Sequence, residues 1–66
     1  MNNVIKLGRA KKELTQAHLA ELVGVSVQTV RNWERRDTQP NAKYIVELSS
    51  LLEIDRGDIV TFYANK

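Results

Sequence analysis

The segment from Thr15 to Glu34 has the pattern of two short helices joined by a tight turn. Thr15 is a residue type that caps helix N-termini, and apolar residues then recur at helical spacing as far as Gly24. Glycine adopts positive φ at little cost, so Gly24 ends the first helix, and Ser26 caps a second helix that runs to about Arg35. Because the turn is too short to let the helices part, they must cross steeply, and the second helix projects from the surface.

The second helix of this pair has two faces. At about 100° per residue, Val30 and Trp33 fall on one side of it, and four other residues span about 140° on the opposite side. These four are Val27, Gln28, Arg31 and Asn32. The first side predicts a contact with the core. The second presents amide and guanidinium groups, which are suited to base edges in the DNA major groove, where a projecting helix fits.

Composition restricts the chain to a small module. Its 66 residues predict one domain over 1–66, with the helix-turn-helix at about 15–35. The sequence has no cysteine and no apolar run or signal-peptide core of the kind that membrane or secreted proteins carry, so we expect a soluble, cytoplasmic, nucleoid-associated protein. His18 is the only histidine, and Ser49 and Ser50 have no evident base. We therefore expect no metal, no cofactor, no membrane association and no enzymatic activity.

Positive charge is concentrated in the first two thirds of the chain. Residues 1–43 hold eight Lys and Arg against four acids, for a net charge of +4, whereas residues 44–66 hold two against four, for −2. An excess of this sign attracts phosphate backbones, although an ordinary solvated face of lysines would give the same count. The position of the charge beside the helix-turn-helix favours a nucleic-acid partner.

Three further helices are expected around this pair. A first helix is predicted from about Asn3 to Glu13, with Gly8 near its middle. Pro40 and Asn41 mark the start of a fourth helix. Its apolar stripe consists of Tyr44, Ile45, Leu48, Leu51 and Leu52. Asp55 then caps a short fifth helix, which has Asp58 in its first turn. The pattern predicts a compact all-α fold of five helices.

Residue types at fixed offsets give the chain a family resemblance. The matching residues are Leu14-Thr15-Gln16, Leu19-Ala20, Val23-Gly24-Val25-Ser26, Thr29-Val30, Trp33-Glu34 and Pro40. This pattern closely resembles the Cro/cI-type (XRE-like) helix-turn-helix of phage repressors, over about residues 4–62. The resemblance implies a lambda-repressor-like DNA-binding domain in a transcriptional regulator, most often a repressor of bacterial or prophage genes. It also implies a homodimer that binds double-stranded DNA at a palindromic operator.

The resemblance assigns roles to individual residues. Base contacts fall on Val27, Gln28, Arg31 and Asn32, and phosphate contacts fall on Gln16, Thr29, Arg36, Asn41 and Lys43. Gln28 suits a bidentate pair with adenine, and Val27 suits either a thymine methyl group or simple surface packing. Arg31 suits guanine or a phosphate, and Thr29 suits a phosphate or a local hydrogen bond.

Other residues are expected to serve the architecture. In relatives the residues matching Arg9 and Glu34 form a salt bridge, and both types are present here. Gly8 stands where relatives usually have leucine, and Glu13 and Arg36 stand where glycine often ends a helix, so shifted or strained helix ends are expected.

Apolar residues near the C-terminus predict a dimer surface. Ile54, Ile59, Phe62 and Tyr63 exceed what so small a core needs, although all four could instead pack inside the monomer. A different class of function also fits a small helical surface, namely a protein-interaction module such as an antitoxin or a regulator's inhibitor. Such a module could bind a protein partner and DNA together.

Overall fold

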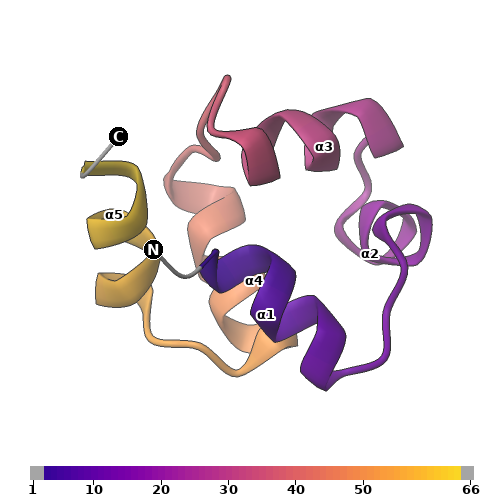
Figure 1. The fold of residues 1–66 in the computed structure, drawn as a ribbon, viewed down its shortest axis with the longest axis horizontal. Coiled ribbons are helices and arrows are strands. Elements are labelled where there is room, and N and C mark those ends of the chain that lie inside the picture. The colour runs from indigo at the N-terminus through magenta and orange to yellow at the C-terminus, as the bar shows by residue number, and fades with distance from the viewer. Residues whose placement is uncertain (1–2, 65–66) are drawn as a thin grey trace.

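The computed structural model describes residues 3–64, which form five α-helices and no strand within that range. In chain order the helices are α1 (Val4–Lys11), α2 (Gln16–Val23), α3 (Val27–Arg35), α4 (Ala42–Leu52) and α5 (Arg56–Ala64). They pack around one another as a small bundle (Figure 1). This architecture confirms the all-α, five-helix, lambda-repressor-like fold that the sequence predicts.

Polar side chains define where the helices start. The residues that cap α1 to α4 are Asn3, Thr15, Ser26 and Asn41. In each case a side-chain oxygen accepts a hydrogen bond of 3.0–3.1 Å from the backbone N–H three positions on. Asp55 precedes α5, and its carboxylate accepts a hydrogen bond of 2.6 Å from the backbone N–H two positions on. These contacts satisfy N–H groups that have no partner inside the helix, so the starts follow from local sequence.

Four helices end in the same way, with one residue in the left-handed region followed by a backbone bond that reaches back five positions. The left-handed residues are Glu13 (φ 57°), Gly24 (φ 85°), Arg36 (φ 63°) and Glu53 (φ 53°). The N–H of each following residue donates to the carbonyl five positions earlier, at 2.9–3.1 Å. Only Gly24 has the residue type that this conformation favours. The absence of glycine at Glu13 and Arg36 therefore leaves strained backbone, as expected, and α1 ends at Lys11.

Replacing Glu13 with glycine should stabilise the fold. The Glu13 side chain is exposed and makes no hydrogen bond or ion pair within residues 3–64, so the substitution removes backbone strain and little else. We expect the free energy of unfolding to rise by roughly 0.5–1 kcal/mol, because part of the relief is offset by the greater freedom of glycine in the unfolded chain. Urea denaturation measures the change. Glu13→Ala is the control, since it keeps Cβ, and equal stability of the two variants would contradict the prediction.

Gly8 has a packing role that the sequence pattern does not reveal. It is buried in α1, and a Cβ atom built there would lie 3.0 Å from Leu52 Cβ and 3.5 Å from Ile54 Cγ2. The leucine that relatives usually have at this position would therefore collide with α4 and the segment that follows it. The glycine lets α1 approach α4 closely, which offsets its cost to the helix.

All five helices contribute to one apolar core. Its buried members are Ile5, Leu19, Ala20, Val23, Val30, Trp33, Leu48, Leu52, Ile59 and Phe62. In the predicted stripe of α4, Leu48 and Leu52 are buried, and Tyr44, Ile45 and Leu51 are half-buried. The core therefore covers one side of each helix.

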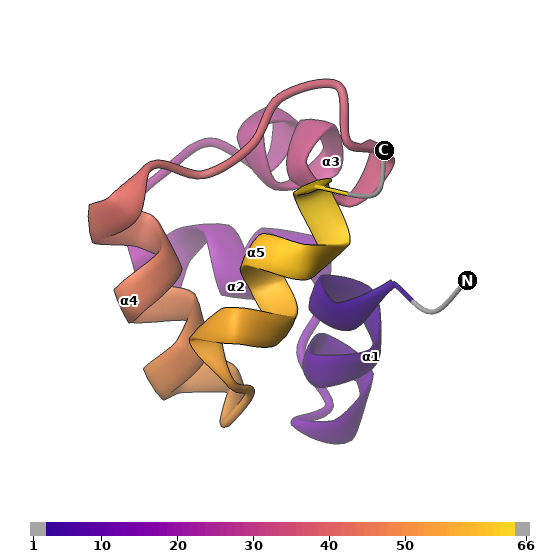
Figure 2. The same ribbon diagram turned by 90° about the vertical axis from the view of Figure 1, so that its left-hand side faces the viewer.

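The helix α3 lies at the edge of the bundle. It packs mainly on α2 and makes fewer contacts with α1. Figures 1 and 2 show it in two perpendicular views along the upper margin of the molecule, with no other helix outside it. The outward side of α3 is therefore free for a partner. None of the helices in residues 3–64 has the length and apolar character needed to cross a membrane.

Candidate nucleic-acid interface

The two sides of α3 differ in burial as its sequence predicts. Val30 and Trp33 are buried, whereas Gln28 and Arg31 are exposed. Val27, at the first position of the helix, is half-buried and packs against the core. The side chains that can reach a partner are therefore mainly polar, with one partly accessible valine near the N-terminus.

A chain of hydrogen bonds runs along the outward side of α3. Gln28 Nε2 donates to Asn32 Oδ1 at 3.0 Å, and Arg35 Nη2 donates to the same oxygen at 2.9 Å. Arg35 also forms an exposed ion pair with Asp37 at 3.0 Å. Because Asn32 Oδ1 already accepts from two donors, the Asn32 amide has its N–H groups left to donate to a partner, whereas Gln28 retains a carbonyl oxygen and one N–H. The Gln28 amide can therefore accept a hydrogen bond from adenine N6 and donate one to adenine N7.

Arg35 belongs to this outward side, although the sequence interpretation leaves it out of the site. It lies seven positions after Gln28, two turns further along α3. Helical spacing alone could have identified it, because residues separated by three, four and seven positions share a face. We define the outer face of α3 as Gln28, Arg31, Asn32 and Arg35.

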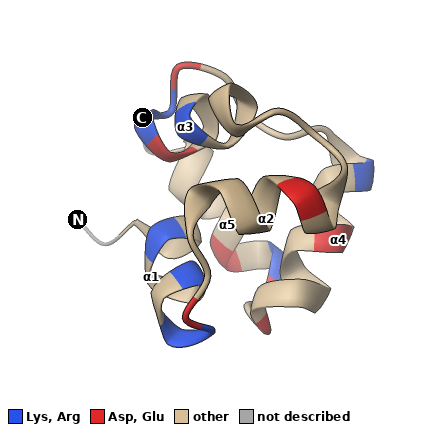
Figure 3. Ribbon diagram, turned by 90° about the vertical axis from the view of Figure 1, so that its right-hand side faces the viewer, with Lys and Arg blue, Asp and Glu red and all other residues tan. Residues whose placement is uncertain are grey.

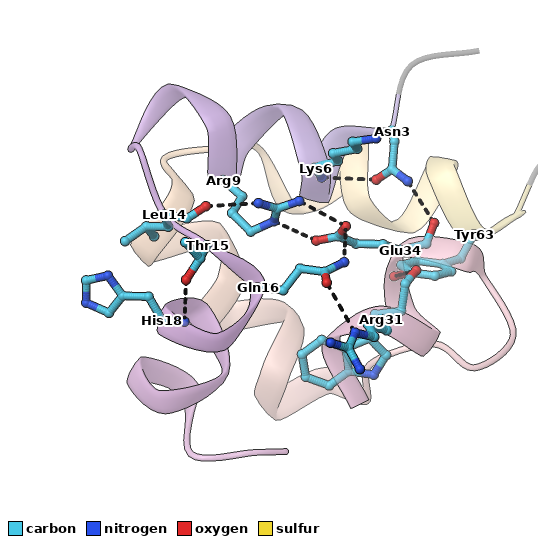
Figure 4. Close-up of polar contacts among 11 residues, drawn as sticks. Asn3, Lys6, Arg9, Leu14, Thr15, Gln16, His18, Arg31, Glu34 and Tyr63 are labelled. Atoms are coloured by element: carbon cyan, nitrogen blue, oxygen red, sulfur yellow. Dashed lines mark hydrogen bonds and ion pairs between the residues drawn. The ribbon is translucent and has the colours of Figure 1, made fainter. Parts of the chain in front are cut away.

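Gln16 links α3 to the N-terminus of α2. Its Nε2 donates to Glu34 Oε1 at 3.1 Å, and its Oε1 accepts from Arg31 Nε at 3.3 Å (Figure 4). The Arg31 guanidinium is therefore drawn toward the start of α2. Lys6 lies at the same place, where it helps line a shallow hollow of about 340 Å³ with Gln16, Arg31 and Arg35. Asn3 and the Glu34 carboxylate also line this hollow, so it holds two amides, three cationic side chains and one acid beside a helix N-terminus. Its net positive charge suits an anionic group.

The ion pair between Arg9 and Glu34, expected from the family resemblance, is present. Arg9 Nε donates to Glu34 Oε2 at 2.8 Å, and Arg9 Nη2 donates to Oε1 at 3.2 Å, which makes the pair bidentate. The two side chains are only 16% and 7% exposed, and Arg9 Nη1 also donates to the Leu14 carbonyl at 2.9 Å. This pair ties α1 and the segment entering α2 to α3, and so it holds the helix-turn-helix in place (Figure 4).

Charged side chains are distributed unevenly over the helices. Figure 3 shows only Lys and Arg on α1, an acidic residue on α2, and residues of both signs on α3 and α4. Asn41 is the cap of α4, and Lys43 is exposed in its first turn, with Nζ at 5.5 Å from the centre of the Tyr44 ring.

The Thr29 hydroxyl lies 2.9 Å from Ser26 Oγ, so it has the local hydrogen bond that was the alternative to a phosphate contact.

Arg36, for which a phosphate contact was expected, is held against α5. Its Nη1 donates to the Phe62 carbonyl at 3.2 Å, and its guanidinium lies 4.8 Å from the centre of the Phe62 ring. The left-handed conformation at Arg36 turns the chain at the end of α3, and the side chain packs on α5. Arg36 is therefore a structural contact between α3 and α5.

The expected dimer surface also needs correction. Ile59 is 0% exposed and Phe62 is 6% exposed, so both belong to the core of the single chain. Ile54 is half-buried, and its Cγ2 lies close to Gly8 in α1. Of the four, Ile54 and Tyr63 are partly accessible, and both are half-buried.

A more accessible apolar surface lies beside Tyr63. Val60 on α5 is 54% exposed, and the sequence interpretation does not include it. With Tyr63, Pro40 and Ile45 it lines a hollow of about 180 Å³. Helical periodicity could have identified Val60. It follows Ile59 directly and so lies about 100° away around the helix, which turns it away from the side that Ile59 buries.

Tyr63 gives the domain an expected alkaline pH dependence. Burial raises the pKa of its hydroxyl, the Glu34 carboxylate raises this pKa further, and the Arg36 guanidinium lowers it. The folded state therefore holds the proton more tightly than the unfolded chain, so the stabilisation is complete below about pH 10 and is lost as pH rises through the folded-state pKa.

The substitution Tyr63→Phe isolates this effect. Above about pH 10, the free energy of unfolding should fall with pH more steeply for the wild type, by up to about 1.4 kcal/mol per pH unit. Urea titrations on either side of that pH measure the difference, and the other titrating groups cancel in the comparison. Identical pH dependence of the two proteins would contradict it.

A tight turn holds α3 against α2, and the exposed side of α3 carries amide and guanidinium groups. This arrangement defines a helix-turn-helix domain. Residues 5–59 match the family model described as Helix-turn-helix, and the chain belongs to this family. This result confirms the resemblance to the Cro/cI type. The family is one of DNA-binding regulators and is not a class of enzymes.

The chain is also similar in sequence to a phage repressor. Repressor protein C2 of Salmonella phage P22 is 38% identical to the chain over 53 residues, which is 80% of this chain. The matched segment is 24% of the repressor, so the chain spans about a quarter of that protein's length. No solved structure matches the chain.

Proposed function

We propose that the chain binds specific sequences in double-stranded DNA as a transcriptional regulator of the phage-repressor type. In this proposal α3 lies in the major groove with its outer face toward the base edges. The observation that carries the proposal is the outer face of α3, where the exposed Gln28 and the half-buried Asn32 form a hydrogen-bonded amide pair. Membership of the helix-turn-helix family and the similarity to a phage repressor support it.

The contacts divide into bases and phosphates. Gln28 and Asn32 read bases, and Val27 contributes an apolar contact such as one with a thymine methyl group. Arg31 was expected among the base contacts, but its hydrogen bond to Gln16 favours a phosphate. The phosphate set is therefore Gln16, Thr29, Arg31, Asn41 and Lys43, and it fixes the register of α3 on the duplex.

Selection from a pool of random duplexes tests the proposal. We expect enrichment of one short motif that contains an adenine for Gln28, and affinity for that duplex should exceed affinity for a scrambled duplex at the same salt concentration. Salt must be held fixed because phosphate contacts make both affinities fall as salt rises. Failure to enrich any sequence would contradict specific recognition.

We propose further that the chain acts as a homodimer on a palindromic operator, with two recognition helices about 34 Å apart. The surface that supports this is the hollow beside Val60 and Tyr63, since an exposed apolar side chain there would be covered by a second copy. Analytical ultracentrifugation with and without the enriched duplex tests it. Val60→Asp should weaken association, and a wild-type monomer at high micromolar concentration, even on the duplex, would contradict the dimer.

A further inference from the structure

The side chains of Tyr63 in α5 and of Asn3, the cap residue of α1, hold the C-terminal carbonyls of α3. The Trp33 carbonyl accepts from the Tyr63 hydroxyl at 2.8 Å and from Arg36 N at 3.2 Å. The next carbonyl, that of Glu34, accepts from Asn3 Nδ2 at 2.7 Å. Carbonyls in the last turn of a helix have no partner within the helix, so these contacts decide how that turn is held.

Two long-range contacts hold the end of α3 against α5, namely the bond from Arg36 to the Phe62 carbonyl and the bond from the Tyr63 hydroxyl to the Trp33 carbonyl. Only the bond from Tyr63 reaches the backbone of α3 itself. It joins a side chain near the C-terminus of α5 to a backbone atom 30 residues earlier in the chain. The Tyr63 ring is itself held, since it packs edge-on against the buried Phe62 with ring centres 5.0 Å apart. Because the ring is fixed, its hydroxyl has little freedom to move. The bond therefore constrains the distance between the last turn of α3 and α5.

The constrained turn is the one that carries part of the outer face. Trp33 lies between Asn32 and Arg35 in the sequence, directly after the first and two positions before the second. Arg35 Nη2 donates a hydrogen bond of 2.9 Å to Asn32 Oδ1. A shift of the Trp33 carbonyl would therefore move Asn32 and, through it, the amide of Gln28. Hydrogen bonds to base edges weaken steeply with small errors in distance and angle, whereas long side chains that contact phosphates tolerate such errors.

We propose that Tyr63 is a positioning residue for base recognition, which acts through its hydroxyl bond to the Trp33 carbonyl. This inference rests on the proposed function. It assigns to α5 a role in sequence discrimination that is separate from any role in dimer formation. Loss of the hydroxyl should reduce the affinity for the enriched duplex and leave the affinity for a scrambled duplex unchanged.

Tyr44→Phe is a closely matched control for Tyr63→Phe. Tyr44 is also half-buried and also packs against Trp33, with ring centres 5.4 Å apart. Its hydroxyl makes no hydrogen bond within residues 3–64, so the substitution removes the same oxygen without removing a bond to α3. Both variants keep the aromatic ring. Circular dichroism establishes the temperature at which both remain folded, and binding is measured there at one salt concentration.

The expected result is a selective loss. Tyr63→Phe should weaken binding to the enriched duplex by between about two- and tenfold, the range that one net hydrogen bond supports. Its binding to the scrambled duplex, and both affinities of Tyr44→Phe, should match the wild type. Wild-type affinity of Tyr63→Phe for the enriched duplex, or an equal loss on both duplexes, would overturn the positioning role. Failure of the wild type to distinguish the two duplexes would instead contradict the proposed function.

Discussion

Replacing Arg9 with alanine is expected to lower the free energy of unfolding by about 3–5 kcal/mol, because the Glu34 carboxylate stays buried with only the neutral Gln16 amide and no opposite charge beside it. Glu34 is 7% exposed and receives two hydrogen bonds from Arg9. The variant also removes the bond to the Leu14 carbonyl. A domain of this size has little stability in reserve, so a large fraction of Arg9→Ala should be unfolded at room temperature.

Arg35→Ala is the matched control for this prediction. It removes an arginine whose ion pair with Asp37 is exposed, with side chains 60% and 56% accessible. Solvent screens such a pair, so we expect a stability change below about 1 kcal/mol. Chemical denaturation followed by circular dichroism compares the two variants. A similar small loss in both would show that the pair with Glu34 does not hold the helix-turn-helix together.

Replacing Gln28 with alanine should cost about 1–3 kcal/mol of binding free energy on the enriched duplex, which is roughly five- to 150-fold in Kd. The reason is that alanine cannot make the bidentate pair with adenine. Gln28 is exposed, and the one hydrogen bond of its side chain within residues 3–64 goes to Asn32, so the fold should be unaffected. Fluorescence anisotropy with labelled duplexes measures the loss.

A thermodynamic cycle separates this base contact from other effects. The wild type and Gln28→Ala are each measured on the enriched duplex and on one whose proposed adenine pair is changed to G·C. If Gln28 reads that adenine, the base change should cost the wild type much more than the variant. Equal costs would assign the adenine preference to another residue.

Local chemistry made much of the fold predictable. Thr15, Ser26 and Asp55 start helices because their side chains bond to nearby N–H groups, and Gly24 ends one through its own backbone. Such contacts lie within a few residues and leave a sequence signature. Helical periodicity predicted three residues of the outer face of α3 in the same way, namely Gln28, Arg31 and Asn32, although Arg35 was left out.

Long-range geometry accounts for what the sequence did not reveal. An apolar residue on α5 can bury itself in its own chain or in a partner, and the pattern does not distinguish these, so Ile59 and Phe62 were placed in the wrong surface. Arg36 was assigned by position and charge, but its side chain bonds to α5. The Tyr63 hydroxyl bond joins residues 30 positions apart and has no local signature.

The central claim is that the outer face of α3 contacts base edges in duplex DNA. Nuclear magnetic resonance of isotope-labelled protein, titrated with the enriched duplex and then with a scrambled duplex of equal length, tests it most directly. We predict that the side-chain amide signals of Gln28 and Asn32 shift strongly with the enriched duplex and much less with the scrambled one. Amide signals of these two residues that stay unchanged while those of another helix respond would contradict the claim.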